Sequence, residues 1–440
     1  MSFHGVFFVV LYVLLACTPA VLAALLGEPG GAFLYQAGRG AALTGVTILV
    51  LQAVLAARWK WLSRPFGLDI VFRFHRRMAL FAGVLLIAHP LLLVAGGAGI
   101  SLATSLDVPW YIWGGRAILL LLVVNLFLST FRKGLGVKFE GWRALHGVAA
   151  FVLLVGAFAH SWFAGADLQH PAMRVIWLVL VVGALAVFAH HRFIRPALRR
   201  SHAYRVAEVR PEAAGVWTVE LEPPEGETTF DYLPGQFHFI TLHRGGELPE
   251  EEHHFTLSSS PTQSGRIAST IKAIGDFTST IGDTEPGDTA SVQGAFGRFS
   301  YRCHPYEHDL VFIAGGIGIT PLMSMLRSMR DREESHRVVL LYGNRTESHI
   351  VFRDELAEIE ADECPDLKVV HVLSRAGEEW AGETGHINGE MLERHVRGDL
   401  AEKVFYICGP DPLRESVIAD LTDRGVPDGQ IRTEIFRLVD

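Results

Sequence analysis

The hydrophobic pattern of the chain changes character near residue 200. Before that point apolar residues form long, almost uninterrupted runs, whereas afterwards they alternate with polar residues in short segments separated by Gly and Pro. Six of the long runs can cross, or nearly cross, the roughly 30 Å hydrocarbon core of a bilayer as helices. They cover residues 3–26, 39–57, 71–95, 113–131, 145–163 and 173–191. The pattern predicts an all-α membrane domain over residues 1–200, followed by water-exposed domains.

Charge supports this division and orients the membrane domain. Residues 1–200 contain five acidic residues and 17 Lys or Arg, whereas residues 201–440 contain 42 acidic residues and 22 Lys or Arg. The basic residues of the first part gather after the second, fourth and sixth runs, and the intervening connections contain none. The positive-inside rule therefore predicts that both termini and the soluble half lie in the cytoplasm. The acidic soluble half argues against nucleic-acid binding.

Two of the apolar runs carry a pair of histidines at the same spacing. His75 and His89 lie in the third run, and His146 and His160 lie in the fifth. Fourteen residues of helix rise about 21 Å and return to nearly the same face, so each helix would place one imidazole near each edge of the membrane. If the helices are parallel neighbours, His75 faces His146 on the cytoplasmic side, and His89 faces His160 outside. This arrangement predicts two bis-histidine haems, although a single membrane histidine often only bonds to a neighbouring helix.

The cysteines point away from other redox centres. Cys17, Cys303, Cys364 and Cys408 lie far apart and form no CxxC pair, so we expect no zinc site, iron–sulfur cluster or disulfide framework. The sequence that ends at Cys17 is similar to a lipoprotein cleavage box. The positively charged segment expected before such a box is missing, so we expect the first helix to be retained.

The soluble half divides into two patterns. Six short segments predict the strands of a small antiparallel barrel, at 203–209, 215–221, 236–242, 255–258, 266–274 and 289–293. From about residue 309, predicted strands alternate with helices, which is typical of a parallel nucleotide-binding sheet. The strands are at 310–314, 337–342, 367–373 and 404–408, and the helices are at 321–331 and 352–360.

A glycine-rich turn at 314–321 joins the first of these parallel strands to its helix. Glycines allow the backbone to approach a pyrophosphate, and the helix N-terminus supplies N–H donors. Such a turn is weak evidence alone, because many strand-to-helix turns are tight only for packing.

Several motifs of the soluble half resemble those of the ferredoxin–NADP reductase superfamily, in the same order along the chain. The segment HHFTLS at 253–258 resembles the flavin-binding HPFT-type motif, and PGQF at 234–237 resembles the strand that precedes it. IKAIGDFT at 271–278 resembles the segment that binds the FAD pyrophosphate, and GAFG at 294–297 resembles its GPFG turn. The glycine turn and CGP at 408–410 resemble the nicotinamide-nucleotide motifs.

With the paired histidines, nearly the whole chain resembles the ferric reductase and NADPH oxidase superfamily, particularly compact bacterial NADPH oxidases. The resemblance implies a six-helix transmembrane domain with two haem b groups over 1–200, an antiparallel β-barrel FAD domain at 201–306 and an α/β NAD(P)-binding domain at 307–440. It also implies a bacterial cytoplasmic membrane. His254 and Ala295 depart from the pattern, because the family has Pro at both positions.

The resemblance also implies individual roles. Phe255 packs on the flavin ring, Thr256 lies near its reactive nitrogen, Cys408 helps to place the nicotinamide, and Phe436 covers the ring face that the nicotinamide must reach. Residues 437–440 extend past this aromatic, which usually ends the chain, and such a tail can hinder nicotinamide access. The other implied FAD residues are His253, Ser258, Lys272, Gly275 and Thr278. The implied nucleotide residues are Gly315, Gly316, Gly318, Thr320, Pro321, Gly409 and Pro410.

A local signal favours NADPH over NADH, although NADH stays possible. Ser374-Arg375 follows a strand and resembles the pair that grips the 2′-phosphate of NADPH in related reductases, and Arg345 adds a second positive charge. A planar guanidinium makes two charge-assisted hydrogen bonds to a phosphate. Either arginine is equally compatible with a solvated surface position.

The predicted function is electron transfer from cytoplasmic NADPH through FAD and two haems to an acceptor outside, with oxygen reduced to superoxide as the best single hypothesis. Arg39, at the outer end of the second run, would attract and stabilise superoxide. Leu93 stands where animal oxidases tend to carry a second histidine, which weakens that hypothesis. A ferric-chelate reductase, or an electron donor to an extracytoplasmic redox protein, is the nearest alternative. A membrane-anchored soluble flavin reductase with structural histidines is the third.

Overall fold

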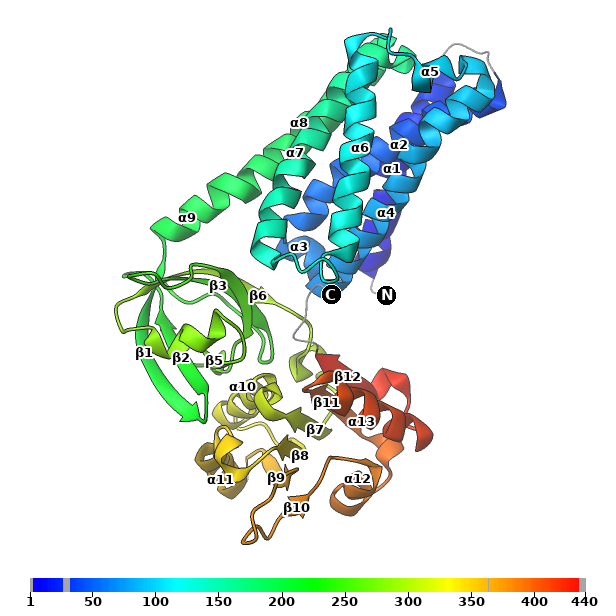
Figure 1. The fold of residues 1–440 in the computed structure, drawn as a ribbon. Helices are drawn as coiled ribbons and strands as arrows, with labels where there is room; N and C mark the ends of the chain where they lie inside the picture. Colours follow the sequence, from blue (N-terminus) through cyan, green and yellow to red (C-terminus); the bar gives the residue numbers. More distant parts are fainter. Residues whose placement is uncertain (1–2, 27–31, 363, 435–440) are drawn as a thin grey trace. The chain divides into compact units, whose positions relative to one another are not determined.

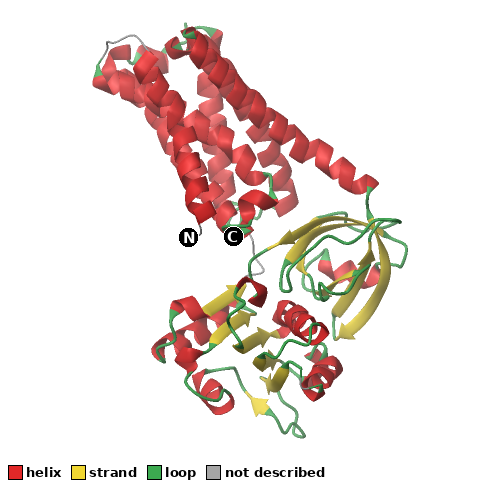
Figure 2. Ribbon diagram, turned by 180° about the vertical axis from the view of Figure 1, so that it is seen from behind, coloured by secondary structure: helices red, strands yellow, loops and turns green. Residues whose placement is uncertain are grey.

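A computed structural model describes residues 3–26, 32–362 and 364–434. The chain folds as two compact units, of which the first ends at Pro196 and the second begins at Ala197. Figures 1 and 2 show that the first unit is helical and that all strands belong to the second. The change in hydrophobic pattern near residue 200 therefore corresponds to a change of architecture.

The first unit contains six helices that are long and apolar enough to cross a membrane. This result confirms the six predicted runs. The long helices are α1 (Phe3–Leu26), α2 (Phe33–Ala56), α4 (Leu68–Leu93), α6 (Trp110–Phe131), α7 (Phe139–Ala164) and α8 (Pro171–Ala189). A π-helical turn, η1 (Val94–Ala98), extends α4, and α8 continues through η3 (His190–Ile194) into α9 (Arg195–Ser201). Short helices α3 (Lys60–Ser63), α5 (Ser101–Thr104) and η2 (Ala166–Gln169) lie in the connections.

Glycines allow close packing within two helix pairs, α2 with α4 and α6 with α7. A Cβ atom at Gly45 of α2 would lie 2.8 Å from Leu86 of α4, and one at Gly156 of α7 would lie 2.4 Å from Ile118 of α6. Without a hydrophobic driving force between helices in lipid, such small residues are the usual means of bringing helix backbones together. Among the described residues α4 and α7, which carry the histidine pairs, make no comparably extensive direct contact. Each of the two histidine helices is therefore supported by a different neighbour.

The second unit begins with an antiparallel six-stranded sheet in the order β4-β3-β6-β1-β2-β5. A bridge between Leu257, just after β4, and Ser269 of β5 joins the two edges of this sheet. The strands are β1 (Tyr204–Ala213), β2 (Val216–Glu222), β3 (Phe237–His243), β4 (Glu252–Thr256), β5 (Ile267–Lys272) and β6 (Thr289–Phe296), with η4 (Thr278–Asp283) between the last two. All six predicted barrel strands are present.

The remainder of the unit is a parallel sheet in the order β10-β9-β8-β7-β11-β12. Its strands are β7 (Asp309–Gly315), β8 (Arg337–Asn344), β9 (Asp366–Leu373), β10 (Glu383–Thr384), β11 (Val404–Cys408) and β12 (Ile431–Glu434). Its helices are α10 (Ile319–Asp331), α11 (Arg353–Ala361), α12 (Gly389–His395) and α13 (Asp411–Asp423). The strand order reverses between β7 and β11, and such a switch point opens a crevice at the carboxyl ends of the strands.

Candidate functional site

His75 of α4 and His146 of α7 lie close to each other. The ring centroids of His75 and His146 lie 6.4 Å apart, with the ring planes at 70°. Two imidazoles on opposite sides of one metal ion, each with a metal–nitrogen distance of about 2 Å, would have their centroids about 6.3 Å apart. The observed spacing therefore fits a bis-histidine haem.

Three of the four histidines have their Nδ1 atom next to an oxygen of a supporting helix. His89 Nδ1 lies 2.9 Å from the carbonyl oxygen of Gly38, and His160 Nδ1 lies 2.7 Å from that of Tyr111. His146 Nδ1 lies 3.1 Å from Asn125 Oδ1. Because a carbonyl oxygen only accepts, Nδ1 carries the proton and Nε2 keeps its lone pair. That tautomer is the one that ligates a metal through Nε2, with the other nitrogen bonded to a supporting group.

Two further contacts fix these imidazole rings. A Cβ atom at position 115 would lie 2.5 Å from the His160 ring, so the glycine of α6 leaves the space that this ring occupies. The His146 ring stacks on Trp142, with centroids 5.2 Å apart and an angle of 26°. The membrane unit therefore holds these two rings by packing as well as by hydrogen bonding.

Arg39, near the start of α2, forms an ion pair with an acidic residue of another segment. Its guanidinium donates from Nε to Asp167 Oδ2 at 2.9 Å, and its Nη2 bonds to Oδ1 of the same carboxylate. Gln36 accepts a third hydrogen bond at 3.1 Å. The Asp167 carboxylate, in η2, is only 7% exposed. The guanidinium thereby joins α2 to η2, and the predicted role of Arg39 in stabilising superoxide stays a prediction.

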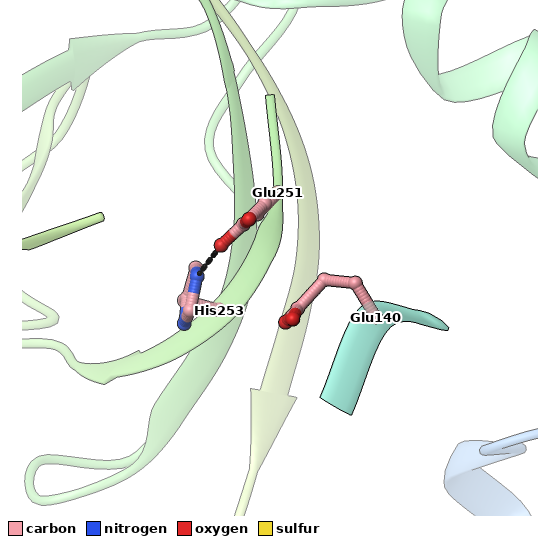
Figure 3. A group of neighbouring side chains, drawn as sticks. All are labelled: Glu140, Glu251 and His253. Atoms are coloured by element: carbon pink, nitrogen blue, oxygen red, sulfur yellow. Dashed lines mark hydrogen bonds and ion pairs between the residues drawn. The ribbon is translucent and has the colours of Figure 1, made fainter. Parts of the chain in front are cut away.

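The predicted flavin motif lies on β4 and its surroundings. The ring of His253 stacks on Phe277, with centroids 4.1 Å apart, and Phe255 lies parallel to the same ring at 6.4 Å. Glu251 bonds to His253 Nε2 at 3.0 Å, as Figure 3 shows. The guanidinium of Arg244 lies 5.2 Å from the Phe277 ring centroid. The three rings and the guanidinium form one stacked cluster. This cluster holds the half-buried ring of Phe255 in place.

Two polar residues of the motif are turned into the protein. Thr256 is 6% exposed and Ser258 is fully buried. The Ser258 hydroxyl bonds to Thr270 Oγ1 at 2.9 Å and to the Ala268 carbonyl at 3.3 Å. The Ser258 N–H also donates to the Ala268 carbonyl at 2.8 Å, so Ser258 joins the end of the motif to β5 through both its side chain and its backbone.

The predicted pyrophosphate segment forms a compact turn after β5. Thr278 Oγ1 accepts hydrogen bonds from the N–H groups of Gly275 at 2.8 Å and Ile274 at 3.0 Å. Gly275 is exposed, and Lys272, at the end of β5, is half-buried. Thr278 therefore shapes the turn through its side chain, whereas the exposed glycine leaves the backbone accessible.

The two predicted nicotinamide-nucleotide motifs touch each other at the switch point. A Cβ atom at Gly318 would lie 2.2 Å from the Cys408 carbonyl oxygen, and one at Gly315 would lie 2.9 Å from Pro410. Gly409 approaches the Gly315 backbone in the same way, so only glycines allow the turns after β7 and β11 to meet. Gly316 takes a positive φ of 54°, which favours glycine.

The remaining residues of these motifs are mainly internal. Thr320 is buried and donates to the Ile317 carbonyl at 3.1 Å, and Pro321 follows in the first turn of α10. The Cys408 thiol is fully buried in the core, and this burial raises its pKa well above the ordinary value. The backbone of Cys408, rather than its thiol, lies beside the glycine turn.

The basic residues predicted to select NADPH lie together. Arg375 N–H donates to the Arg345 carbonyl at 2.8 Å, and Ser374 N–H donates to the Asn344 carbonyl at 3.0 Å. These bonds continue the pairing of β8 and β9 past their carboxyl ends. Both arginines are exposed at this end of the sheet, where a parallel fold binds nucleotides. Phe436 and the tail 437–440 lie outside the described residues.

Comparisons with known proteins agree with this architecture. Residues 41–157 match the family described as ferric reductase like transmembrane component, and residues 312–418 match the oxidoreductase NAD-binding domain. Together these two matches identify an oxidoreductase and support a place in the ferric reductase/NADPH oxidase-like superfamily. The matched transmembrane family and the six long apolar helices support an integral membrane protein.

Three individual proteins to which the chain is similar share 22–30% of its residues over the matched regions. NADH-cytochrome b5 reductase 2 of Scheffersomyces stipitis is 30% identical over 183 residues, which is 40% of this chain and 61% of that protein. The reductase component of propane 2-monooxygenase of Mycolicibacterium goodii is 28% identical over 239 residues, 52% of this chain and 66% of that protein. The flavohem-like FAD/NAD-binding domain of nitric oxide dioxygenase from Vibrio cholerae O1 biovar El Tor is 22% identical, with a TM-score of 0.47, and the match covers 53% of this chain and 97% of that one.

Several site residues were missed in the sequence. The carbonyl groups of Gly38 and Tyr111 carry no signal in residue type, because every residue has one. Asn125 did carry a signal, since it is a single amide inside an apolar run. Asp167 also carried one, as an acid in a connection without Lys or Arg, but its partner Arg39 is 128 positions away.

Proposed function

We propose that the protein transfers electrons from cytoplasmic NADPH across the membrane to an extracytoplasmic acceptor. The observation that carries the proposal is the pair His75 and His146, whose ring centroids are 6.4 Å apart between helices that do not pack extensively together. The proposal is also supported by the Nδ1 atoms of three of the four histidines, each of which has an oxygen of a neighbouring helix as its hydrogen-bond partner.

The residues present fit two haems, one FAD and one NADPH. In this assignment His75 and His146 hold the inner haem, and His89 and His160 hold the outer one. A flavin held in the barrel would supply the exchange between two-electron hydride chemistry and the single-electron chemistry of haem iron. The stacked cluster of His253, Phe255 and Phe277 would lie against the bound flavin.

The nucleotide assignment depends on the parallel sheet. The glycine turn after β7 would admit the pyrophosphate at Gly316, where a Cβ atom would meet nothing within 4 Å. Arg345 and Arg375 would hold a 2′-phosphate, which is why we favour NADPH over NADH. Similarity to NADH-cytochrome b5 reductases supports a pyridine-nucleotide reductase but leaves NADH as the competing donor.

Oxygen, reduced to superoxide, is the acceptor that we propose first, on the resemblance to compact bacterial NADPH oxidases. A ferric chelate is the second candidate, and two observations favour it. Arg39 is neutralised by Asp167, and Leu93 stands one turn after His89, where animal oxidases tend to carry a histidine. An oxidase site would therefore lack two of its expected polar groups.

Spectroscopy of the purified full-length protein in detergent tests the proposal. We expect two haems per FAD, a bis-histidine Soret band, and reduction of flavin and haem by NADPH without oxygen. Turnover with oxygen, followed by a superoxide-specific probe, is then compared with turnover on a ferric chelate. A protein that binds FAD but no haem would contradict the transmembrane route and would identify a membrane-anchored flavin reductase.

A further inference from the structure

Arg327 is a buried cation that no motif of the sequence singled out. It lies on α10, which starts at the glycine turn of the nucleotide sheet, and it is only 7% exposed. Its Nε and Nη2 donate to the two oxygens of Glu355 on α11, at 2.7 and 2.5 Å. Its Nη1 donates to the backbone carbonyl of Ser258 at 2.6 Å. The guanidinium carbon lies 4.7 Å from the ring centroid of Phe352.

These contacts join the two halves of the soluble unit. Ser258 is the last residue of the flavin motif, two residues after β4, and belongs to the barrel, whereas Glu355 and Phe352 belong to the nucleotide-binding domain. Ser324, one turn before Arg327, donates to the Ser259 carbonyl at 2.7 Å. One face of α10 is therefore bonded to two successive carbonyl groups of the segment that leaves β4.

The geometry of this contact exceeds what stability needs. Transferring a cation from water into the protein interior costs free energy. A well-packed apolar pair at the same positions often stabilises a protein as well as an ion pair, or better. A guanidinium held by a bidentate carboxylate, a carbonyl and an aromatic face has no freedom to rotate, so it transmits the position of α10 to β4. The same helix begins at Gly318, next to the Cys408 carbonyl of the nucleotide crevice.

We propose that Arg327 is a positioning residue for hydride transfer. It fixes the end of the flavin-motif strand relative to the helix that starts at the nucleotide turn, and so sets the distance between the two reacting rings. The inference rests on the proposed function, because it assumes that FAD and NADPH occupy these two sites. Glu355 acts through Arg327, by holding its guanidinium in one orientation.

The test compares variants of the full-length protein in detergent by stopped-flow absorbance, which follows flavin reduction by NADPH without oxygen. Arg327→Lys keeps the charge but loses the planar fork, and Arg327→Gln loses both. Both should slow hydride transfer roughly 10- to 100-fold, since displacements near 1 Å can have effects of that size. FAD content and the Kd for NADPH should stay at wild-type values, because neither variant alters a predicted cofactor contact.

Arg330→Gln is the matched control. Arg330 lies on the same helix and approaches the same carboxylate at 3.8 Å, but it is more exposed. Its loss should leave the rate unchanged. Ser324→Ala is a milder variant in case the Arg327 variants fold poorly, and it should slow hydride transfer in the same direction by less.

A charge exchange separates positioning from stability. In the double variant Arg327→Glu with Glu355→Arg the ion pair can form again, but a glutamate at 327 cannot donate to the Ser258 carbonyl. We expect this variant to regain thermal stability while hydride transfer stays slow. Recovery of both together would overturn the proposal.

Other outcomes are equally decisive. A wild-type rate in properly folded Arg327 variants, or a rate that falls only in proportion to lost FAD, would show that Arg327 is merely structural. If the wild-type protein itself binds no FAD, or if NADPH does not reduce its flavin, the proposed function fails, and this inference fails with it. The wild-type measurement therefore distinguishes the two failures before any variant is compared.

Discussion

The exposed arginines at the ends of β8 and β9 should decide between NADPH and NADH. Backbone hydrogen bonding places Arg345 and Arg375 next to each other. Only NADPH carries a 2′-phosphate, so removal of either guanidinium should affect that nucleotide alone. The change that we consider is Arg375→Ala, followed by Arg345→Ala and the double variant.

The size of the effect follows from charge and exposure. A hydrogen bond between charged groups contributes about 1.5–3 kcal/mol. Because both arginines are exposed, water and salt compete with the phosphate, which favours the lower end of that range. Arg375→Ala should then lower kcat/KM for NADPH roughly tenfold. The double variant should lose roughly 100-fold if the two contributions add, although neighbouring residues often couple.

The assay is steady-state reduction of ferricyanide, which takes electrons from flavin and needs no haem. The preference for NADPH should shrink as ionic strength rises, because exposed charges are screened over about 10 Å at 0.1 M salt. Arg397→Ala, at an exposed position of the same domain, should leave both nucleotides unaffected. Equal losses for NADPH and NADH in the Arg375 variant would refute the assignment of a 2′-phosphate site.

Three further predictions concern the membrane unit. His160→Ala should remove the outer haem, so the pyridine haemochrome assay should find about half the haem per protein with FAD unchanged; full haem content would contradict ligation. Asn125→Leu removes the acceptor at His146 Nδ1 and should weaken retention of one haem about 10- to 100-fold in a competition assay with apomyoglobin, because supporting hydrogen bonds have effects of that size. Arg39→Met should destabilise the unit by about 3 kcal/mol in thermal unfolding, because it leaves the Asp167 carboxylate buried and unpaired, and adding Asp167→Leu should restore most of that loss; additive losses would show that the pair is not coupled.

Strong periodic signals explain why much of the fold could be predicted. Continuous apolar runs identified all six long helices, and a predicted strand at 367–373 corresponds to β9 at Asp366–Leu373. Among the described residues of the nucleotide-binding domain, the helices α12 and α13 and the edge strands β10 and β12 were not predicted. In α13 only Val417 and Leu421 are buried, so no wide apolar stripe marked the helix. The edge strand β10 has two residues, which is too short for any alternation to be visible.

The candidate site was predictable only where a side chain carries the chemistry. Equal spacing of the histidines and the order of the soluble motifs were visible in the sequence. The contribution of Arg327 was not visible, because it depends on a backbone carbonyl 69 positions away. Arg39 was visible as a cation, but its ion pair with Asp167, 128 positions away, was not visible. Contacts between distant segments, rather than residue types, decide these cases.

The supporting helices repeat the spacing of the ligands. On α6, Tyr111 and Asn125 are 14 positions apart, and they contact His160 and His146, which are also 14 apart on the antiparallel α7. On α2, Gly38 contacts His89. Helix α6 therefore presents an oxygen to both histidines of α7. Since α6 must keep both contacts at once, we expect a substitution that shifts it along its axis to disturb His146 and His160 together.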